Sequence, residues 1–151
     1  MEFSAAGMAL LKRSEGFRGR VYLDTGGVPT IGWGHRLLHP NSFTDGITPA
    51  MAETVLSCDV DDAEEAVEHL VKVPLTQGQF DALVDFVFNL GPTRLCNSTL
   101  LKDLNAGHYD DAAGQLLRWD HGMEAGKEVE LADLEARRKE EVALWKGGVT
   151  A

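Results

Sequence analysis

The sequence predicts an α+β fold that is mostly helical, in which a small lobe and a larger helical lobe are joined by one long helix. Two observations support this prediction. Residues 20–31 alternate between apolar and polar side chains on either side of Gly26-Gly27, which is typical of a hairpin of short strands. After Thr48-Pro49 the apolar residues instead recur at helical spacing, in one segment after another.

Two helices are expected to flank this hairpin. A short N-terminal helix should end at Gly16, which places Glu15 near its C-terminus. A long helix is expected over residues 49–72, because a threonine N-cap and a proline in the first turn begin it and Pro74 stops it. Its acidic residues between 59 and 68 are expected to form a solvated face.

The remainder of the chain is expected to be helical. An apolar segment from Phe80 to Leu90 predicts a core helix, which Gly91-Pro92 ends. Further amphipathic helices are expected over residues 98–105, 110–119 and 131–145, with a turn at Gly107 and a loop over residues 122–126. We therefore expect a single domain over residues 1–151, with a small lobe at about 13–46, a connecting helix at about 49–72 and a helical lobe at about 75–147, against which the N-terminal helix packs.

The composition narrows the class of partner. The chain has 151 residues, of which 44% are hydrophobic and 25% charged, as in an ordinary globular protein. Its formal net charge of -10 argues against a nucleic acid or an anionic membrane as partner, because proteins bind both through clustered Lys and Arg. No stretch reaches the roughly 20 apolar residues that a transmembrane helix needs, and the N-terminus lacks the pattern of a signal peptide. We expect no membrane insertion, no signal or anchor, and a monomer.

The two cysteines do not indicate a special site. Cys58 and Cys96 are far apart in the sequence and match no metal-ligand spacing. We expect two buried thiols rather than a zinc site or a disulfide framework. No metal and no cofactor are expected.

The chemistry of the chain is concentrated between residues 15 and 35. Glu15 and Asp24 are two carboxylates in one short segment, and Thr30 adds a hydroxyl. Cleavage of a glycosidic bond uses one carboxylic acid to protonate the leaving oxygen and a second carboxylate to handle the water or the cation-like sugar. An acidic pair alone is weak evidence, because most Glu and Asp residues lie on protein surfaces.

The spacing around this pair makes the prediction specific. Glu15 is followed by Gly16, eight residues separate Glu15 from Asp24, five separate Asp24 from Thr30, and Ile31-Gly32-Trp33-Gly34-His35 follows. In this pattern the sequence resembles the phage-type lysozymes, the endolysins of glycoside hydrolase family 24. The resemblance continues, in the order expected for that family, through residues 47–53, 73–91, 97–101, 104–107 and 117–119, Arg137-Arg138 and Glu141.

The resemblance implies a role for each member of the triad. Glu15 would be the general acid, Asp24 would orient or activate the attacking water, and Thr30 would hold that water. The reaction implied is hydrolysis, with inversion, of the β-1,4 bond between N-acetylmuramic acid and N-acetylglucosamine in bacterial peptidoglycan. It would serve phage-mediated host lysis, with synthesis in the host cytoplasm, a holin for release, and action in the periplasm or cell wall.

Three further residues are expected to contact the substrate. Asn89 is a polar side chain that closes an apolar helix beside a glycine turn, so it needs a partner. Gly91 would shape the same edge. Trp33 is expected either to be a core residue or to line the glycan cleft. By contrast, a histidine that follows a glycine-rich strand is more often structural than catalytic, and the resemblance implies that His35 is a packing and ion-pair residue.

The segment after Trp119 departs from the family pattern. Residues 120–138 carry extra acids, and Ala132-Asp133 stands where the family has a glycine. This leaves any substrate contact in that loop unassigned. Two alternatives also remain open: a lytic transglycosylase, which needs a single acid, and a non-catalytic wall-binding protein of the same fold.

The acidity of the chain predicts a dependence on salt. A net charge of -10 opposes approach to a polyanionic cell envelope, and salt screens such repulsion over about 8–10 Å at moderate ionic strength. Clearing of whole envelopes, followed by turbidity, should therefore rise with moderate salt or divalent cations. A steady fall from low to moderate ionic strength would contradict this prediction.

Overall fold

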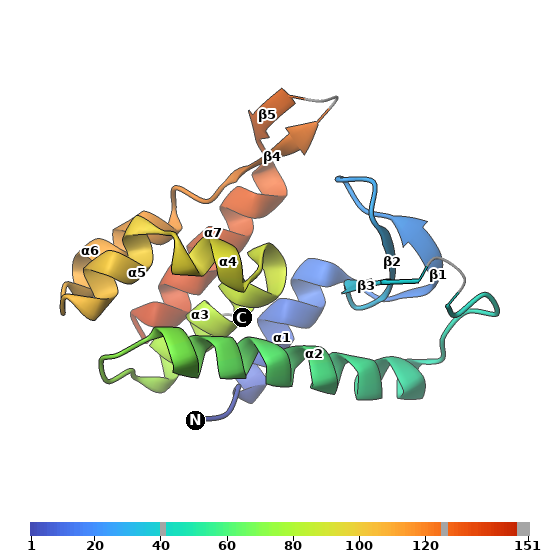
Figure 1. Cartoon of the computed structure of the whole chain (residues 1–151), viewed down its shortest axis with the longest axis horizontal. Helices are drawn as coiled ribbons and strands as arrows, with labels where there is room; N and C mark the ends of the chain where they lie inside the picture. The colour runs from blue at the N-terminus through green and yellow to red at the C-terminus, as the bar shows by residue number, and fades with distance from the viewer. Residues whose placement is uncertain (40–41, 125–126, 148–151) are drawn as a thin grey trace.

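The computed structural model describes residues 1–39, 42–124 and 127–147. Its elements in chain order are α1 (Ala5–Glu15), β1 (Arg18–Leu23), β2 (Pro29–Gly32), β3 (His35–Arg36), α2 (Pro49–Leu70), α3 (Gln77–Leu90), α4 (Pro92–Cys96), α5 (Thr99–Asn105), α6 (Tyr109–Leu116), β4 (His121–Glu124), β5 (Lys127–Glu130) and α7 (Ala132–Trp145). The predicted α+β, mostly helical arrangement is confirmed: a small sheet lies on one side and the helices on the other, with α2 running beneath both (Figure 1).

Helix α2 connects two separate hydrophobic cores. Thr48 caps its first turn by accepting a hydrogen bond from the Met51 amide at 3.2 Å, and Pro49 occupies the first position, as expected. Ala52, near the beginning of the helix, packs into a small core under the sheet with Ile31, Leu37 and Ile47. The later buried residues of the same helix pack into the large core of the helical side: Leu56, Val60, Ala63 and Val67.

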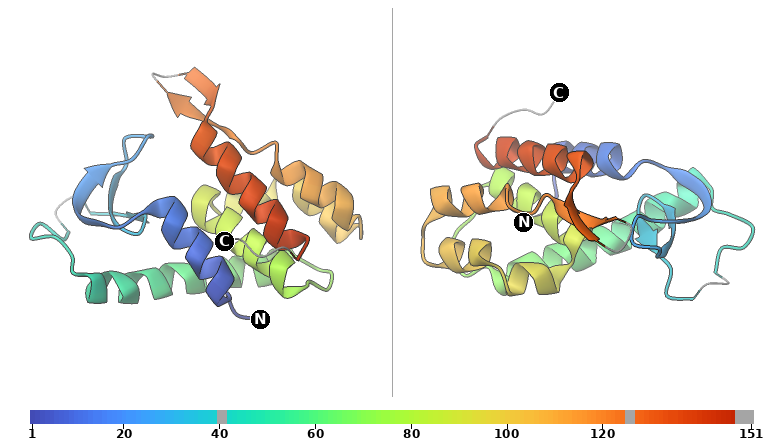
Figure 2. Two further views of the ribbon diagram at one scale, coloured as in Figure 1. Left: turned by 180° about the vertical axis from the view of Figure 1, so that it is seen from behind. Right: turned by 90° about the horizontal axis from the view of Figure 1, so that it is seen from above.

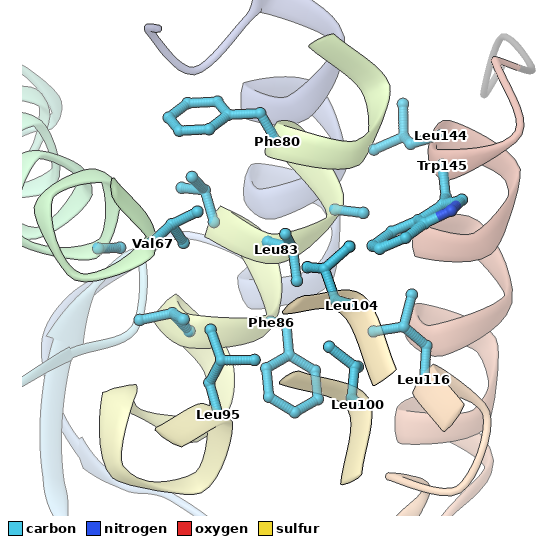
Figure 3. Close-up of a cluster of buried hydrophobic side chains, with 14 of the residues drawn as sticks. Val67, Phe80, Leu83, Phe86, Leu95, Leu100, Leu104, Leu116, Leu144 and Trp145 are labelled. Atoms are coloured by element: carbon cyan, nitrogen blue, oxygen red, sulfur yellow. The ribbon is translucent and has the colours of Figure 1, made fainter. Parts of the chain in front are cut away.

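Helix α3 forms the centre of the large core. Thr76 and Gln79 make a capping box at its beginning, and its residues from Phe80 to Val87 are all buried. A helix that is buried on every side needs apolar residues all round, which the sequence provides except at Asp81 and Asp85. The carboxylates of these two residues accept hydrogen bonds from Ser4 and Arg137. Figure 3 shows side chains from several surrounding helices converging on Leu83 and Phe86. Helices α1, α2, α4 and α7 pack against α3 (Figure 2).

The three-stranded sheet has the antiparallel order β1-β2-β3. Thr30 on β2 lies opposite Tyr22 on β1 and opposite Arg36 on β3. The predicted hairpin is therefore present, and its turn carries Asp24. The short third strand, which the sequence pattern did not indicate, extends the hairpin to a sheet.

Two further regions of the chain differ from the sequence-based prediction. Gly91, at φ 93°, ends α3 as expected, but Pro92 then begins the additional short helix α4, because its fixed φ suits a first helical turn. In the region of the loop expected over residues 122–126, β4 (His121–Glu124) and β5 (Lys127–Glu130) instead pair as an antiparallel ladder. Glycine and acidic residues are rare in strands, so the local composition gave no indication of these two strands. Residues 125–126 themselves lie outside the described part of the chain.

The prediction of two buried thiols is wrong. Cys58 and Cys96 are both free and both exposed. On α2 the buried positions include Leu56 and Val60, and Cys58 lies halfway between them, on the opposite face of the helix. Within the described residues, no helix is long and apolar enough to cross a membrane.

Two helical glycines predict opposite effects of an added methyl group. A Cβ at Gly78 would collide with the Leu144 carbonyl oxygen and lie 3.0 Å from its carbon, whereas a Cβ at Gly114 would meet nothing within 4 Å. Gly114→Ala should raise the free energy of unfolding by about 0.5–1 kcal/mol, because alanine favours helix. Gly78→Ala should lower it by about 1–3 kcal/mol, because α3 and α7 must separate. Urea denaturation measures both, and equal shifts would contradict the close contact.

Candidate active site

A cleft of about 660 Å³ lies between the sheet and the beginning of α7, which face one another in Figure 1. Glu15, Asp24, Thr30 and Asn89 all line it. Three elements and one turn, distant in the sequence, therefore bring four of the six predicted site residues together.

Glu15 is the last residue of α1, and its carboxylate is held from two sides. Oε2 accepts a hydrogen bond from Nη1 of Arg137, and the side chain is only 17% exposed. On the other side lies Gly34, at φ 67°, where an added Cβ would stand 2.8 Å from the carboxyl carbon of Glu15. Because position 34 has no side chain, the carboxylate of Glu15 can occupy the space beside it.

Asp24 is fixed by the turn that follows β1. Its Oδ1 accepts hydrogen bonds from the amides of Gly26 at 2.9 Å and Val28 at 2.8 Å. Its Oδ2 lies 3.7 Å from Nε of Arg36. Because the turn occupies Oδ1, Oδ2 is the oxygen that a molecule in the cleft can engage.

The hydroxyl proton of Thr30 is already used in a hydrogen bond within the sheet wall. The residue is 2% exposed, and Oγ1 donates to the carbonyl of Val28 at 2.8 Å. A hydroxyl that donates in this way keeps its lone pairs for an incoming donor. Thr30 can therefore accept a hydrogen bond from a water in the cleft.

A buried arginine connects Glu15 to the core. Arg137 on α7 makes a two-pronged pair with Asp85 on α3, with both N···O distances at 2.9 Å, while its Nη1 reaches Glu15. Burial alone would raise the pKa of Asp85, but the charge and hydrogen bonds of Arg137 hold it below its usual range. Despite burial, Asp85 and Glu15 raise the pKa of Arg137, so it stays a cation.

A second buried arginine lies next to the first. Arg138 donates to Glu141 at 2.8 Å and to the side-chain oxygen of Asn89 at 2.9 Å, and its guanidinium lies 5.3 Å from the centre of the Phe86 ring. Burial raises the pKa of Glu141 well above its usual range, although Arg138 opposes the shift. Asn89 is thus anchored from behind, which satisfies the partner requirement expected for it.

The other predicted residues lie away from the cleft lining. Trp33 packs against both hydrophobic cores, with its ring 5.1 Å from that of Phe17. Gly91 forms the junction between α3 and α4. Neither is among the residues that line the cleft. The Nδ1 atom of His35 lies 2.8 Å from Asp59 on α2, which is the ion-pair role expected for it.

Sequence reasoning assigned no role to three residues of this region. Tyr22 lines the cleft, and burial raises the pKa of its phenol, with a further rise from Glu15 and Asp24 and an opposing effect of Arg18. Arg36 lines it beside Asp24. Asp85 lies behind it; the available signal was an acid inside an otherwise apolar helix, which needs a buried partner. Among the described residues, no group of three or more His, Cys, Asp or Glu is arranged to hold a metal ion.

Gly34 offers a test of how Glu15 is placed. In Gly34→Ala the new methyl group would displace the Glu15 carboxylate. If Glu15 is the general acid that the sequence predicts, the predicted peptidoglycan cleavage should fall about 100-fold, as expected for a misplaced catalytic group. Gly107→Ala is the matched control, since it has the same backbone strain at φ 84° but no neighbour within 4 Å. Equal activity of the two variants would contradict the proposed packing.

Asp85 predicts a pH-dependent loss of stability. Asp85→Asn should lower the free energy of unfolding by about 3–5 kcal/mol at neutral pH, because Arg137 stays buried with one partner fewer. Since the folded-state pKa of Asp85 is lowered, its contribution is complete above the unfolded-state pKa and is lost as the pH falls through the folded-state pKa. The difference from wild type should be constant between about pH 7 and 5 and shrink below about pH 4.

Urea denaturation across this pH range measures the effect. Asp62→Asn, on the exposed face of α2, is the matched control and should change stability by less than about 0.5 kcal/mol. A difference between wild type and Asp85→Asn that stays constant at low pH would rule out the lowered pKa.

Comparison with known proteins agrees with this geometry. The family model described as phage lysozyme matches residues 12–141. The endolysin of Acyrthosiphon pisum secondary endosymbiont phage 1 is 39% identical over 146 residues, covering 97% of this chain and 99% of the relative. The endolysin of Salmonella phage P22 is 40% identical over 148 residues, covering 96% and 98%.

A solved structure extends the agreement to the fold. The endolysin from Escherichia coli O157:H7 phage FAHEc1 superposes with a TM-score of 0.85 at 35% identity, covering 96% of this chain and 93% of that one. The family match runs through both walls of the cleft, from Glu15 to Arg137. The chain therefore belongs to the phage lysozyme family.

Proposed function

We propose that this chain is an endolysin that hydrolyses the β-1,4 bond between N-acetylmuramic acid and N-acetylglucosamine in bacterial peptidoglycan during phage-mediated host lysis. Membership of the phage lysozyme family, with endolysins 39% and 40% identical along nearly their whole length, supports a peptidoglycan hydrolase that acts on the cell wall. The observation that carries the proposal is that Glu15, Asp24 and Thr30 line one cleft, each held by contacts of its own.

In this mechanism Glu15 is the general acid. Its carboxyl group protonates the glycosidic oxygen as the bond breaks, which leaves a carboxylate beside Arg137. The guanidinium then stabilises the charge that develops on Glu15. Because Asp85 already balances the charge of Arg137, this cation needs no further counter-ion from the substrate.

Asp24 and Thr30 form the water site. A water that donates one hydrogen bond to Oδ2 of Asp24 and the other to Oγ1 of Thr30 keeps a lone pair free for attack on the anomeric carbon. Asp24 takes up the proton as the general base. Attack from the face opposite the leaving group inverts the configuration, as in glycoside hydrolase family 24, so the new reducing end forms as the α-anomer.

The biological setting follows from the same assignment. The enzyme is made in the host cytoplasm, is released through a holin, and acts as a monomer on peptidoglycan in the periplasm or cell wall. The endolysin relatives support the last part of this setting, action on the cell wall. Asn89, anchored by Arg138, is the residue proposed to contact the glycan, because it lines the cleft whereas Trp33 and Gly91 are not among the lining residues.

Zymography on purified peptidoglycan tests the acid. Glu15→Gln keeps the shape of the side chain but cannot supply the proton, so activity should fall by about 100-fold or more. Glu65→Gln, on the exposed face of α2, makes the same chemical change outside the cleft and should leave activity unchanged. Full activity of Glu15→Gln would refute the assigned acid and favour another centre.

The products distinguish hydrolysis from the alternatives. Mass spectrometry of the digest should show hydrated muropeptides, because the Asp24–Thr30 pair supplies water to the anomeric carbon. Anhydromuropeptides as the main product would instead identify a lytic transglycosylase. Binding to peptidoglycan without any product would identify a wall-binding protein.

A further inference from the structure

The four arginines that line the cleft differ in how their charge is balanced. Arg13 lies 3.2 Å from Glu140, and Arg137 is paired with Glu15 and Asp85. Arg18 and Arg36, on the sheet side, are less neutralised. The guanidinium of Arg18 lies 4.7 Å from the centre of the Tyr22 ring, and no carboxylate among the described residues pairs with it. Arg36 approaches Asp24 at 3.7 Å, and its side chain is 62% exposed.

The sheet places these two cations at the ends of one row. Tyr22, Thr30 and Arg36 lie directly opposite one another across the three strands, so their side chains project from the same face. Arg18 covers the Tyr22 ring at the far end of this row. All four residues line the cleft. Two guanidinium groups therefore flank the water-holding Thr30 on the sheet wall.

The helical wall of the cleft, opposite the sheet, carries an excess of negative charge on α7. Helix α7 contributes Asp133 and Glu140 to the cleft lining. The cleft is thus polarised, in a chain whose net charge is -10. The sheet wall has two cations, Arg18 and Arg36, against Asp24, whereas α7 has two carboxylates, Asp133 and Glu140, against Arg137. An anionic group on a bound ligand would turn toward the sheet, because opposite potentials in a cleft orient a ligand.

Taking the muramidase function proposed above as given, we propose that Arg18 and Arg36 form a carboxylate-binding subsite. It takes a carboxylate of the stem peptide, or the lactyl carboxylate of a muramic acid that carries no peptide, and so selects anionic glycan strands. A guanidinium presents a fork of N–H donors that matches a carboxylate. At 3.7 Å, the contact of Nε with Asp24 is longer than a hydrogen bond, so the donors of Arg36 remain available.

The test compares an anionic substrate with a neutralised one. Native peptidoglycan fragments and the same fragments with their carboxylates amidated are digested by wild type, Arg18→Gln and Arg36→Gln. On native fragments each variant should raise KM about three- to tenfold, as expected for an exposed charge pair, and change kcat less than about twofold. On amidated fragments the variants should match wild type, and Arg36→Lys should restore most of the affinity for native fragments.

The matched control is Arg20→Gln. Arg20 is an exposed arginine on the same strand as Arg18, it is not among the cleft residues, and its Cγ lies near Gly46 instead. The control removes the same charge and should leave KM unchanged on both substrates. An equal rise of KM in Arg20→Gln would show that only net charge matters, which overturns the subsite.

Two other results would also overturn it. KM values of both glutamine variants that equal wild type on native fragments would show that the arginines do not touch the substrate. A fall of kcat that is equal on native and amidated fragments would show that they only position Asp24 or Tyr22. Failure of wild type to cleave either substrate would instead refute the proposed function, so the two failures can be distinguished.

Strands from which an amidase has removed the stem peptides identify the carboxylate. Such strands carry only the lactyl carboxylate, which the amidase frees from its amide bond to the peptide. If the variants still show a raised KM on them, the subsite binds the lactyl group. If the effect disappears, the subsite binds the stem peptide. Both results support a carboxylate subsite.

Discussion

Arg137 is a buried cation shared between two carboxylates, one in the core and one in the cleft. A guanidinium in an apolar interior costs several kcal/mol unless it is well paired. The two-pronged pair with Asp85 provides this compensation and leaves Nη1 for Glu15. The interaction joins α3, α7 and α1, so the position of the proposed acid depends on how these helices pack.

This arrangement requires α3 and α7 to lie very close together. At the other end of the same helix pair, Gly78 leaves room for the backbone of Leu144, which sets the approach of the two helices. Closer to the cleft, the same approach allows Arg138 to reach Asn89 and Glu141. Packing in the core is therefore what holds the helical wall of the cleft in place.

The sheet wall is built by a different principle. Asp24 and Thr30 are oriented by hydrogen bonds within a few residues of their own positions, from the turn amides and to the carbonyl of Val28. Such local contacts form wherever the hairpin forms and need no distant partner. The proposed water site is thus preorganised by the hairpin, whereas the proposed acid is positioned by long-range contacts.

The charges of this protein act differently over long and short distances. Over long distances the net charge of -10 opposes an anionic cell wall, and this repulsion is screened by salt. Within the cleft, Arg18 and Arg36 offer a local attraction that the net charge conceals. An acidic chain can therefore still attract an anionic group locally, because salt screens distant charges more strongly than charges in close contact.

The sequence by itself determined the long helices and the hairpin turn, because helix caps, alternation and glycine turns are local signals. It did not indicate the short elements β3, α4, β4 and β5, and the triad stays a prediction. It predicted α2 from Thr48-Pro49 with its beginning correct and its end two residues too late, and the spacing of Glu15, Asp24 and Thr30 indicated the family. It misplaced Cys58 and Cys96, because burial depends on which helix face has a neighbour. Only the tertiary structure decided that Arg137, 122 residues after Glu15, would be its partner, because that pairing depends on the approach of α7 to α3 and α1.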